Sequence, residues 1–210
     1  MSAAASPAPI RVAVFYDWQN VYMTAREAFD LYNMPNEYGN FSPYQLARVL
    51  AAGNERGATG QLVMVEVHRG LPSQKRDPVG YAANRRQSAA WMNENREIVV
   101  PKLRPLRYPQ NYPSDPAVEK GVDVNLALGA VESTLRQRCE VAIVFSHDSD
   151  LLPVPETICR LAGPTRVETA SWRSDNFQKR LRPSGRVHHH YVSQDVFERV
   201  ETRVNYAHPA

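Results

Sequence analysis

The chain has 210 residues, of which 43% are hydrophobic and 22% charged, with a net charge of +3. This composition excludes an intrinsically disordered chain, and the length suits one well-packed domain. No apolar run is long enough to cross a bilayer, and residues 1–9 are predicted to form a flexible tail rather than a signal peptide. Cys139 and Cys159 lack a CxxC partner, which indicates reduced thiols in a cytoplasmic protein rather than a zinc site.

Strand and helix patterns alternate along the first half of the chain. A strand is predicted over residues 10–16, followed by helices over 19–31 and 42–53. Ser42 as N-cap, Pro43 in the first turn and Gly53 at the end support the second helix. A strand over 60–70, a helix over 77–95 and a strand within 96–108 complete this half.

The second half continues the alternation after a Pro-rich loop at 105–116. The pattern predicts a helix over 117–137, a strand at 140–150, a helix to Gly163, a strand over 165–172, and a short strand and helix within 191–204. Segments such as "VAVFY" and "VAIVF" are apolar on both faces, as in a parallel sheet covered by helices. We therefore expect one three-layer, Rossmann-like α/β domain over residues 10–200, with a mostly parallel sheet and a tail at 201–210.

Basic residues gather in two segments. Residues 69–107 carry nine Lys or Arg against three acids, and residues 172–191 carry five against one. Clustered basic residues near aromatic ones suit a phosphate backbone, although an ordinary solvated surface explains the charge about equally well.

Acidic residues follow the apolar strands. Asp17 ends the first strand, Asp148 and Asp150 follow the fourth, and Asp123 lies near the start of the long helix. Because ligands of open parallel sheets bind outside the carboxyl ends of the strands, we expect these carboxylates to meet. Carboxylates held together repel one another unless a cation lies among them, and oxygen ligands suit hard cations such as Mg2+. Such a cation can activate water and stabilise charge on a phosphoryl group.

Each acid also has a simpler explanation. Asp17 could form a turn with Asn20, and Asp150 could cap the helix that begins "DLLP". Spacing alone leaves these explanations and the metal site about equally favoured.

Three segments, in order, resemble the signatures of one family. "VFYDWQNVY" resembles the Asp-x-x-Asn signature that opens NYN domains, a branch of the PIN-like nuclease superfamily; "EKGVDVNLALGAVE" resembles the family's Lys-Gly-x-Asp helix; "VFSHDSDLLPV" resembles its Ser-Gly-Asp-x-Asp segment. The resemblance extends over residues 11–196. It implies a PIN-type fold and metal-dependent cleavage of RNA, leaving 5′-phosphate and 3′-hydroxyl ends.

The same resemblance assigns roles to residues. Asp17, Asp123, Asp148 and Asp150 would be the catalytic carboxylates that hold one or two Mg2+ or Mn2+ ions. Asn20 would orient the first carboxylate or the substrate, Ser146 would add contacts at the strand end, and Lys120 would meet a phosphate or pair with the acids. The basic residues expected to guide single-stranded RNA are Arg85, Arg86, Lys102, Arg104, Arg180 and Arg182. Bases could stack on Tyr81, Tyr108, Trp91 or Trp172, although the two tryptophans are predicted to lie in the core.

Two departures from the family pattern matter. Gly129 stands where many relatives carry a further Asp, and His147 replaces a Gly. The missing acid keeps an alternative open, a nucleic-acid-binding or interaction module with a weakened or inactive metal site. A phosphatase of another Rossmann-like type is disfavoured, because no second Asp follows Asp17 two residues later.

Residues His188 to His190 form a run of three histidines. Consecutive side chains alternate faces on a strand, so the run predicts a basic surface strand rather than a metal site. The sequence leaves a monomer and a homodimer equally open.

Overall fold

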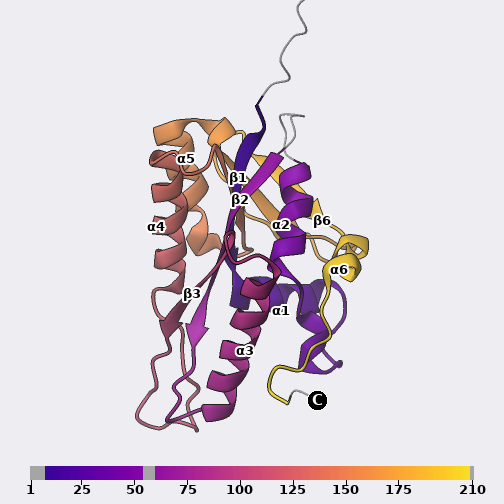
Figure 1. Ribbon diagram of the computed structural model, residues 1–210, viewed down its shortest axis with the longest axis vertical. Helices are drawn as coiled ribbons and strands as arrows, with labels where there is room; N and C mark the ends of the chain where they lie inside the picture. The colour runs from indigo at the N-terminus through magenta and orange to yellow at the C-terminus, as the bar shows by residue number, and fades with distance from the viewer. Residues whose placement is uncertain (1–7, 54–59, 209–210) are drawn as a thin grey trace, which may run out of the picture.

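The computed structural model describes residues 8–53 and 60–208. Its centre is a six-stranded sheet with the order β3-β2-β1-β4-β5-β6, in which every neighbouring pair is parallel (Figure 1). The strands are β1 (Ile10–Asp17), β2 (Gly60–Leu71), β3 (Val99–Pro105), β4 (Val141–Phe145), β5 (Val167–Trp172) and β6 (His188–Val192). The strand order reverses between β1 and β4, which is the point where open α/β sheets bind ligands.

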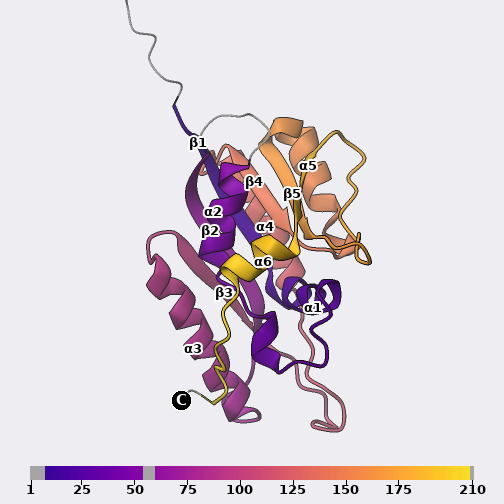
Figure 2. The ribbon, with the colours of Figure 1, turned by 90° about the vertical axis from the view of Figure 1, so that its right-hand side faces the viewer.

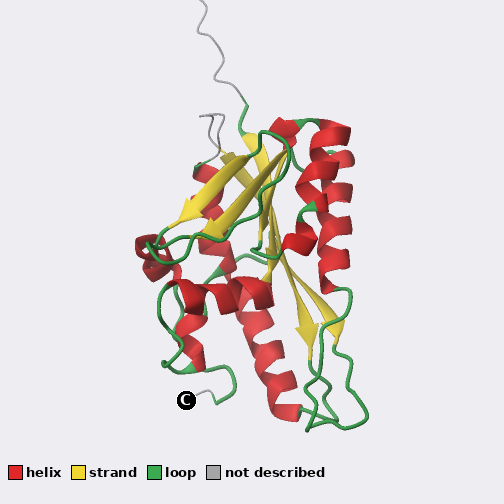
Figure 3. Cartoon of the chain, turned by 180° about the vertical axis from the view of Figure 1, so that it is seen from behind, coloured by secondary structure: helices red, strands yellow, loops and turns green. Residues whose placement is uncertain are grey.

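Helices cover both faces of the sheet (Figures 1 and 2). They are α1 (Trp18–Ala28), α2 (Pro43–Ala52), α3 (Pro78–Glu94), α4 (Val122–Leu135), α5 (Pro153–Ala162) and α6 (Gln194–Val200). The helices α4 and α5 pack on one face, and the other helices lie on the opposite side, as the view from behind also shows (Figure 3). The predicted three-layer α/β fold is therefore confirmed.

The strands that carry the predicted acids are buried. All five residues of β4 are buried, and in β1 only Arg11 is partly exposed. In β1, Val12, Val14 and Tyr16 belong to one core, and Ala13 and Phe15 belong to the core beneath α4 and α5. The alternation follows from the strand period of two, and it directs the next side chain, Asp17, toward the α4 face.

The sequence placed the start of the long helix too early. The helix α4 begins at Val122 rather than at 117, because Gly121 adopts a left-handed conformation with φ of 73°. The preceding residues are not helical, and Val118 forms an antiparallel bridge with Arg107. The histidine run forms a strand as predicted, β6, which continues to Val192.

Other sequence expectations fall on described residues and hold. Ser42 accepts a hydrogen bond from the Gln45 amide at the start of α2, and Asp77 caps α3 through the Gly80 amide. Both cysteines are free, and Cys139 is buried. No helix in the described part of the chain is long and apolar enough to span a membrane. The predicted N-terminal tail lies largely outside the described residues, which begin at 8.

Candidate active site

A cleft of about 440 Å³ opens at the carboxyl end of β1, beside the first turn of α4. Its lining includes Asp17, Asn20, Glu119, Asp123 and Asp148. These residues come from the end of β1, the start of α1, the segment before α4, the first turn of α4 and the loop after β4. Three of the four predicted acids therefore share one cavity, and Glu119 adds a carboxylate that the sequence did not single out.

Asp17 is the most deeply buried acid of the cleft, with 8% of its surface exposed. The pKa of Asp17 is raised to about 6, chiefly by burial and also by the negative charges of Glu119 and Asp148, against the lowering effect of a hydrogen bond from Ser146. The side chain makes no capping hydrogen bond to α1, although Asp17 occupies the N-cap position. The Asn20 backbone amide nevertheless lowers the pKa of Asp17, so a local turn with Asn20 helps to hold this carboxylate alongside Ser146.

Ser146 links the two strand ends. Its hydroxyl donates to Asp17 Oδ2 at 3.0 Å and accepts from the Asp148 amide at 3.1 Å. Because Ser146 is fully buried, this bridge holds the carboxylate of β1 in a fixed relation to the loop after β4. Ser146 is thus a positioning residue for both acids.

Hydrogen bonds from α1 and β5 hold the loop after β4 at its residue His147. Asn20 Oδ1 accepts from the His147 amide at 2.8 Å. The His147 ring accepts from the Trp172 amide at Nε2, so its proton lies on Nδ1, where it meets Thr24 Oγ1 at 3.0 Å. Burial lowers the pKa of His147 to about 4. His147 is therefore a neutral, structural side chain, neither exposed nor placed to exchange a proton.

Glu119 reaches the cleft because α4 starts late. Its Oε1 accepts from the Gly70 amide at 2.6 Å, which ties the segment before α4 to the end of β2. A helix over 117–137 would have placed this residue on a helical turn. The sequence signal that could have located it is Gly121, whose freedom to adopt positive φ sets the start of the helix at the next residue.

Comparison with known proteins decides the family. The sequence profile of the NYN domain matches residues 11–182. The chain belongs to the NYN domain family. This family lies within the PIN-like nuclease superfamily, and its members are generally nucleases that use divalent metals.

The fold also resembles one solved structure, that of a protein of unknown function from Vibrio parahaemolyticus RIMD 2210633. The TM-score is 0.52 at 19% identity, and the match covers 91% of this chain and 97% of the other. This likeness concerns the fold alone. Among curated proteins, none matches the chain.

Asp150 does not join the other acids of this NYN domain. It is exposed in a short 3₁₀ turn (Ser149–Leu151), and it is not among the residues that line the cleft. Its amide donates to Asp148 Oδ1 at 3.0 Å, so Asp148 caps this turn while its side chain also borders the cleft. The assignment of Asp150 as a metal ligand stays a prediction.

The predicted basic residues fall into separate places. Arg104 and Lys120 line a second hollow of about 330 Å³ together with Arg107, and this hollow shares Gly121 with the acidic cleft. Arg86 instead donates to the carbonyls of Tyr206 and Ala207 in the C-terminal segment. Of the predicted cations, Arg104 and Lys120 are thus the two that adjoin the acids.

The remaining predicted cations lie elsewhere. Arg180 and Arg182 line a pocket beside β5 and β6, and Lys102 pairs with Glu66. Arg85 is exposed on α3. Trp91 and Trp172 are buried, as predicted for core residues, whereas Tyr81 and Tyr108 are partly exposed.

Gly129 lies within α4 and faces the sheet rather than the cleft. A Cβ at this position would come within 2.8 Å of Glu66 Oε2. Glu66 is held there by His68 Nε2 at 3.0 Å and by Lys102 Nζ at 3.1 Å. The space that a side chain at position 129 would need is therefore occupied by a carboxylate from β2.

The acidic cleft fits a hard divalent cation. Its donors are carboxylate oxygens, and the charged groups that act on buried Asp17 are themselves acidic. Carboxylates in this arrangement favour a bound cation, and Mg2+ binds through one or two of them while keeping several waters. Asp17 and Asp148 would hold the ion, with Asp123 and Glu119 at the rim.

Proposed function

We propose that this NYN domain is a metal-dependent ribonuclease that hydrolyses phosphodiester bonds of single-stranded RNA. The observation that carries the proposal is the convergence of Asp17, Glu119, Asp123 and Asp148 on one open cleft at the strand-order reversal. A bound Mg2+ or Mn2+ would supply an activated water and stabilise charge on the phosphoryl group.

The residues of the chain prepare this chemistry before substrate binds. Ser146 fixes the separation of Asp17 and Asp148, and Asn20 holds the loop through the His147 amide. Held carboxylates need no rearrangement when the cation and the phosphate arrive, which is the usual source of electrostatic catalysis.

The hollow that adjoins the cleft would receive the RNA backbone. Arg104, Arg107 and Lys120 line it, and the Arg104 guanidinium packs over Gly121, which borders both cavities. A phosphate bound by these cations would place the neighbouring phosphodiester toward the acids. The cations would be sequence-independent contacts, as expected for backbone recognition.

The competing function, a binding module without catalysis, rests on Gly129. The space beside Gly129, where many relatives carry the further acid, is filled by Glu66, which is already paired with Lys102. The cleft then depends on the acids that line it and receives none from the middle of α4.

The test is cleavage of a labelled RNA with single-stranded loops, in Mg2+, in Mn2+ and in EDTA. Replacing Asp148 by Asn should reduce the rate by about 10²–10³-fold, the loss typical of one charge-stabilising group. The matched control is Asp195→Asn, because Asp195 is exposed on α6 outside the cleft. Asp150→Asn should have a much smaller effect than Asp148→Asn. RNA that is bound but uncut by the wild type would favour the binding module.

A further inference from the structure

The histidine run lies on β6, the edge strand next to β5. Successive side chains alternate along a strand, so His188 and His190 share one face and His189 points to the other. His189 meets Thr169 Oγ1 at 2.7 Å and Ser171 Oγ at 2.9 Å. The register pairs His188 with Glu168 of β5, so Glu168 shares the face of His188 and His190.

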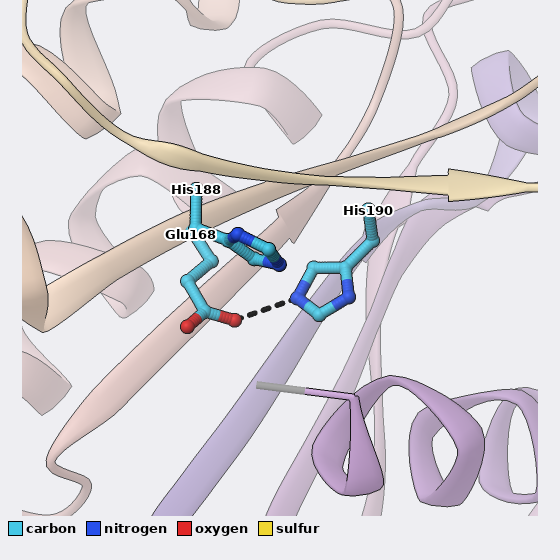
Figure 4. Close-up of side chains that lie close together, drawn as sticks. All are labelled: Glu168, His188 and His190. Carbon is cyan, nitrogen blue, oxygen red and sulfur yellow. Dashed lines mark hydrogen bonds and ion pairs between the residues drawn. The ribbon is translucent and has the colours of Figure 1, made fainter. Parts of the chain in front are cut away.

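Glu168, His188 and His190 converge on that face (Figure 4). Among the described residues, these three offer ligand atoms that all lie within 4.8 Å of one another. His190 Nε2 and Glu168 Oε2 are 2.6 Å apart, and both side chains are at most 9% exposed. The rings of His188 and His190 lie 4.7 Å apart.

The carboxyl end of α2 closes on the same cluster. A Cβ on Gly53, the C-cap of α2, would lie 3.7 Å from His190 Nδ1. Because the carboxyl end of a helix carries partial negative charge, it favours a cation nearby. A positive charge at the cluster would therefore meet both Glu168 and this helix end.

We propose that Glu168, His188 and His190 form a second metal site, for Zn2+ or a similar first-row divalent cation. Two imidazoles and one carboxylate suit zinc, whereas Mg2+ prefers oxygen ligands alone. A tetrahedral zinc site with bonds of about 2.0–2.2 Å places its ligand atoms about 3.4 Å apart. The three ligand atoms, which all lie within 4.8 Å of one another, are already close to this spacing.

The site is separate from the acidic cleft. Glu168 lies on the face covered by α2, whereas Asp17 borders α4 on the other face. The ion would join the edge strand β6 to β5 and would hold the strand from which α6 begins. With three protein ligands, the fourth position of the ion would be open to water. The inference does not depend on the ribonuclease function.

The experiment is Zn2+ titration by calorimetry, using untagged protein stripped with a chelator and kept in excess Mg2+. We expect one Zn2+ per chain and a higher Tm on binding, because a ligand of the folded state stabilises it. Replacing the partly exposed His188 by Asn should abolish the Mg2+-resistant binding, and Glu168→Gln should do the same. Circular dichroism would establish that each variant is folded.

Two variants serve as controls. His208→Asn removes an exposed histidine outside the cluster, and Asp17→Asn with Asp148→Asn removes two acids of the cleft. Both should keep the Zn2+ binding. The proposal is wrong if folded wild-type protein binds no Zn2+, if His188→Asn leaves binding intact, or if the Asp17/Asp148 variant abolishes it. Since binding is measured without RNA, its failure is distinguishable from a failure of cleavage.

Discussion

Asp17 and Glu66 are buried to almost the same extent, at 8% and 6% exposed, on neighbouring strands of one sheet face. Their surroundings differ. The pKa of Asp17 is raised to about 6 by burial together with the charges of its neighbours Glu119 and Asp148. Burial would also raise the pKa of Glu66, but the hydrogen bond and charge of His68, followed by those of Lys102, outweigh it and lower the pKa.

The protein supplies charge and hydrogen-bond partners for the Glu66 carboxylate, whereas the Asp17 carboxylate has no cationic partner among the described residues that shift its pKa. Glu66 has the Lys102 ammonium and the hydrogen-bonding ring of His68 as partners, so removing this carboxylate would leave both groups without it. The Ser146 hydroxyl favours the ionised form of Asp17, but burial and the acidic neighbours disfavour it and prevail. A site that is costly without a cation and open to solvent is where a metal would bind.

The largest expected effect is on cleavage. Asp17→Asn should reduce the cleavage rate by about 10²–10³-fold, because it removes the most buried acid of the cleft. Glu66→Gln should change the rate by only a few-fold, since Glu66 does not line the cleft. Single-turnover cleavage with Mg2+ would measure both rates, using variants that circular dichroism shows to be folded like the wild type. Equal losses of cleavage rate in the two variants would contradict the assignment of Asp17, but not Glu66, to the metal site.

Stability should respond in the opposite order. Glu66→Ala should lower the free energy of unfolding by about 2–4 kcal/mol, because it leaves His68 and Lys102 without their carboxylate. This loss is somewhat smaller than the range of about 3–5 kcal/mol for breaking a fully buried pair, because Lys102 is 38% exposed. Urea unfolding would measure it, with Glu198→Ala on the exposed face of α6 as the control. A loss below about 1 kcal/mol would mean that the cluster contributes little.

Asp17→Asn should stabilise the metal-free protein above pH 6. The folded-state pKa of about 6 exceeds the ordinary value of 3.8. The wild type therefore loses stability as the pH rises between these values, and the loss reaches about 3 kcal/mol. The substituted amide does not titrate, so the variant gains up to about that amount at pH 8 and little at pH 4.

Urea unfolding in EDTA at both pH values would test this. Mg2+ should restore the stability of the wild type at pH 8 and leave the variant nearly unchanged. A variant that is less stable than the wild type at pH 8 in EDTA would show that the cleft favours an ionised Asp17 without metal.

The sequence predicted the fold from features that are local or periodic. The doubly apolar strands β1 and β4 and the capped helix α2 follow directly from residue pattern, and the strand ends locate Asp17 and Asp148. The topology then brings these two acids together without any further information. The sequence predicted contacts of Ser146 at the strand end, but not that its hydroxyl links Asp17 to the Asp148 amide.

Other parts of the site depend on contacts that no local pattern encodes. Glu119 enters the cleft because the Arg107–Val118 bridge and the positive φ of Gly121 delay α4. The environment of Gly129 is set by Glu66 on a strand more than 60 residues earlier. The cluster of Glu168 with His188 and His190 likewise requires the register of β5 and β6, which the sequence does not specify.

A moderate effect is expected at Gly129, where the Glu66 cluster meets α4. Gly129→Asp should be less stable than Gly129→Ala by about 1–3 kcal/mol, because it brings a second carboxylate against Glu66. Ala and Asp share the Cβ that meets Glu66, so the comparison isolates the added carboxylate, apart from a helix-propensity difference of at most about 0.7 kcal/mol. Thermal unfolding of the two variants would measure the difference. An increase in cleavage by Gly129→Asp would instead indicate that the acid missing from this position limits activity.

The smallest effect should come from the hollow beside the cleft. Arg104→Ala removes a cation that borders Gly121, and it should weaken RNA affinity by less than about tenfold at physiological salt. If Arg104 contacts one phosphate, the slope of log affinity against log salt should decrease by about 0.7, the value for a single strand. Arg199→Ala, on the exposed side of α6, provides the charge-matched control and should leave the slope unchanged. Fluorescence anisotropy with a labelled single strand, using the inactive Asp148→Asn background, would measure both. Equal slopes for the Arg104 and Arg199 variants would place the RNA backbone away from this hollow, even if the acids of the cleft prove essential for cleavage.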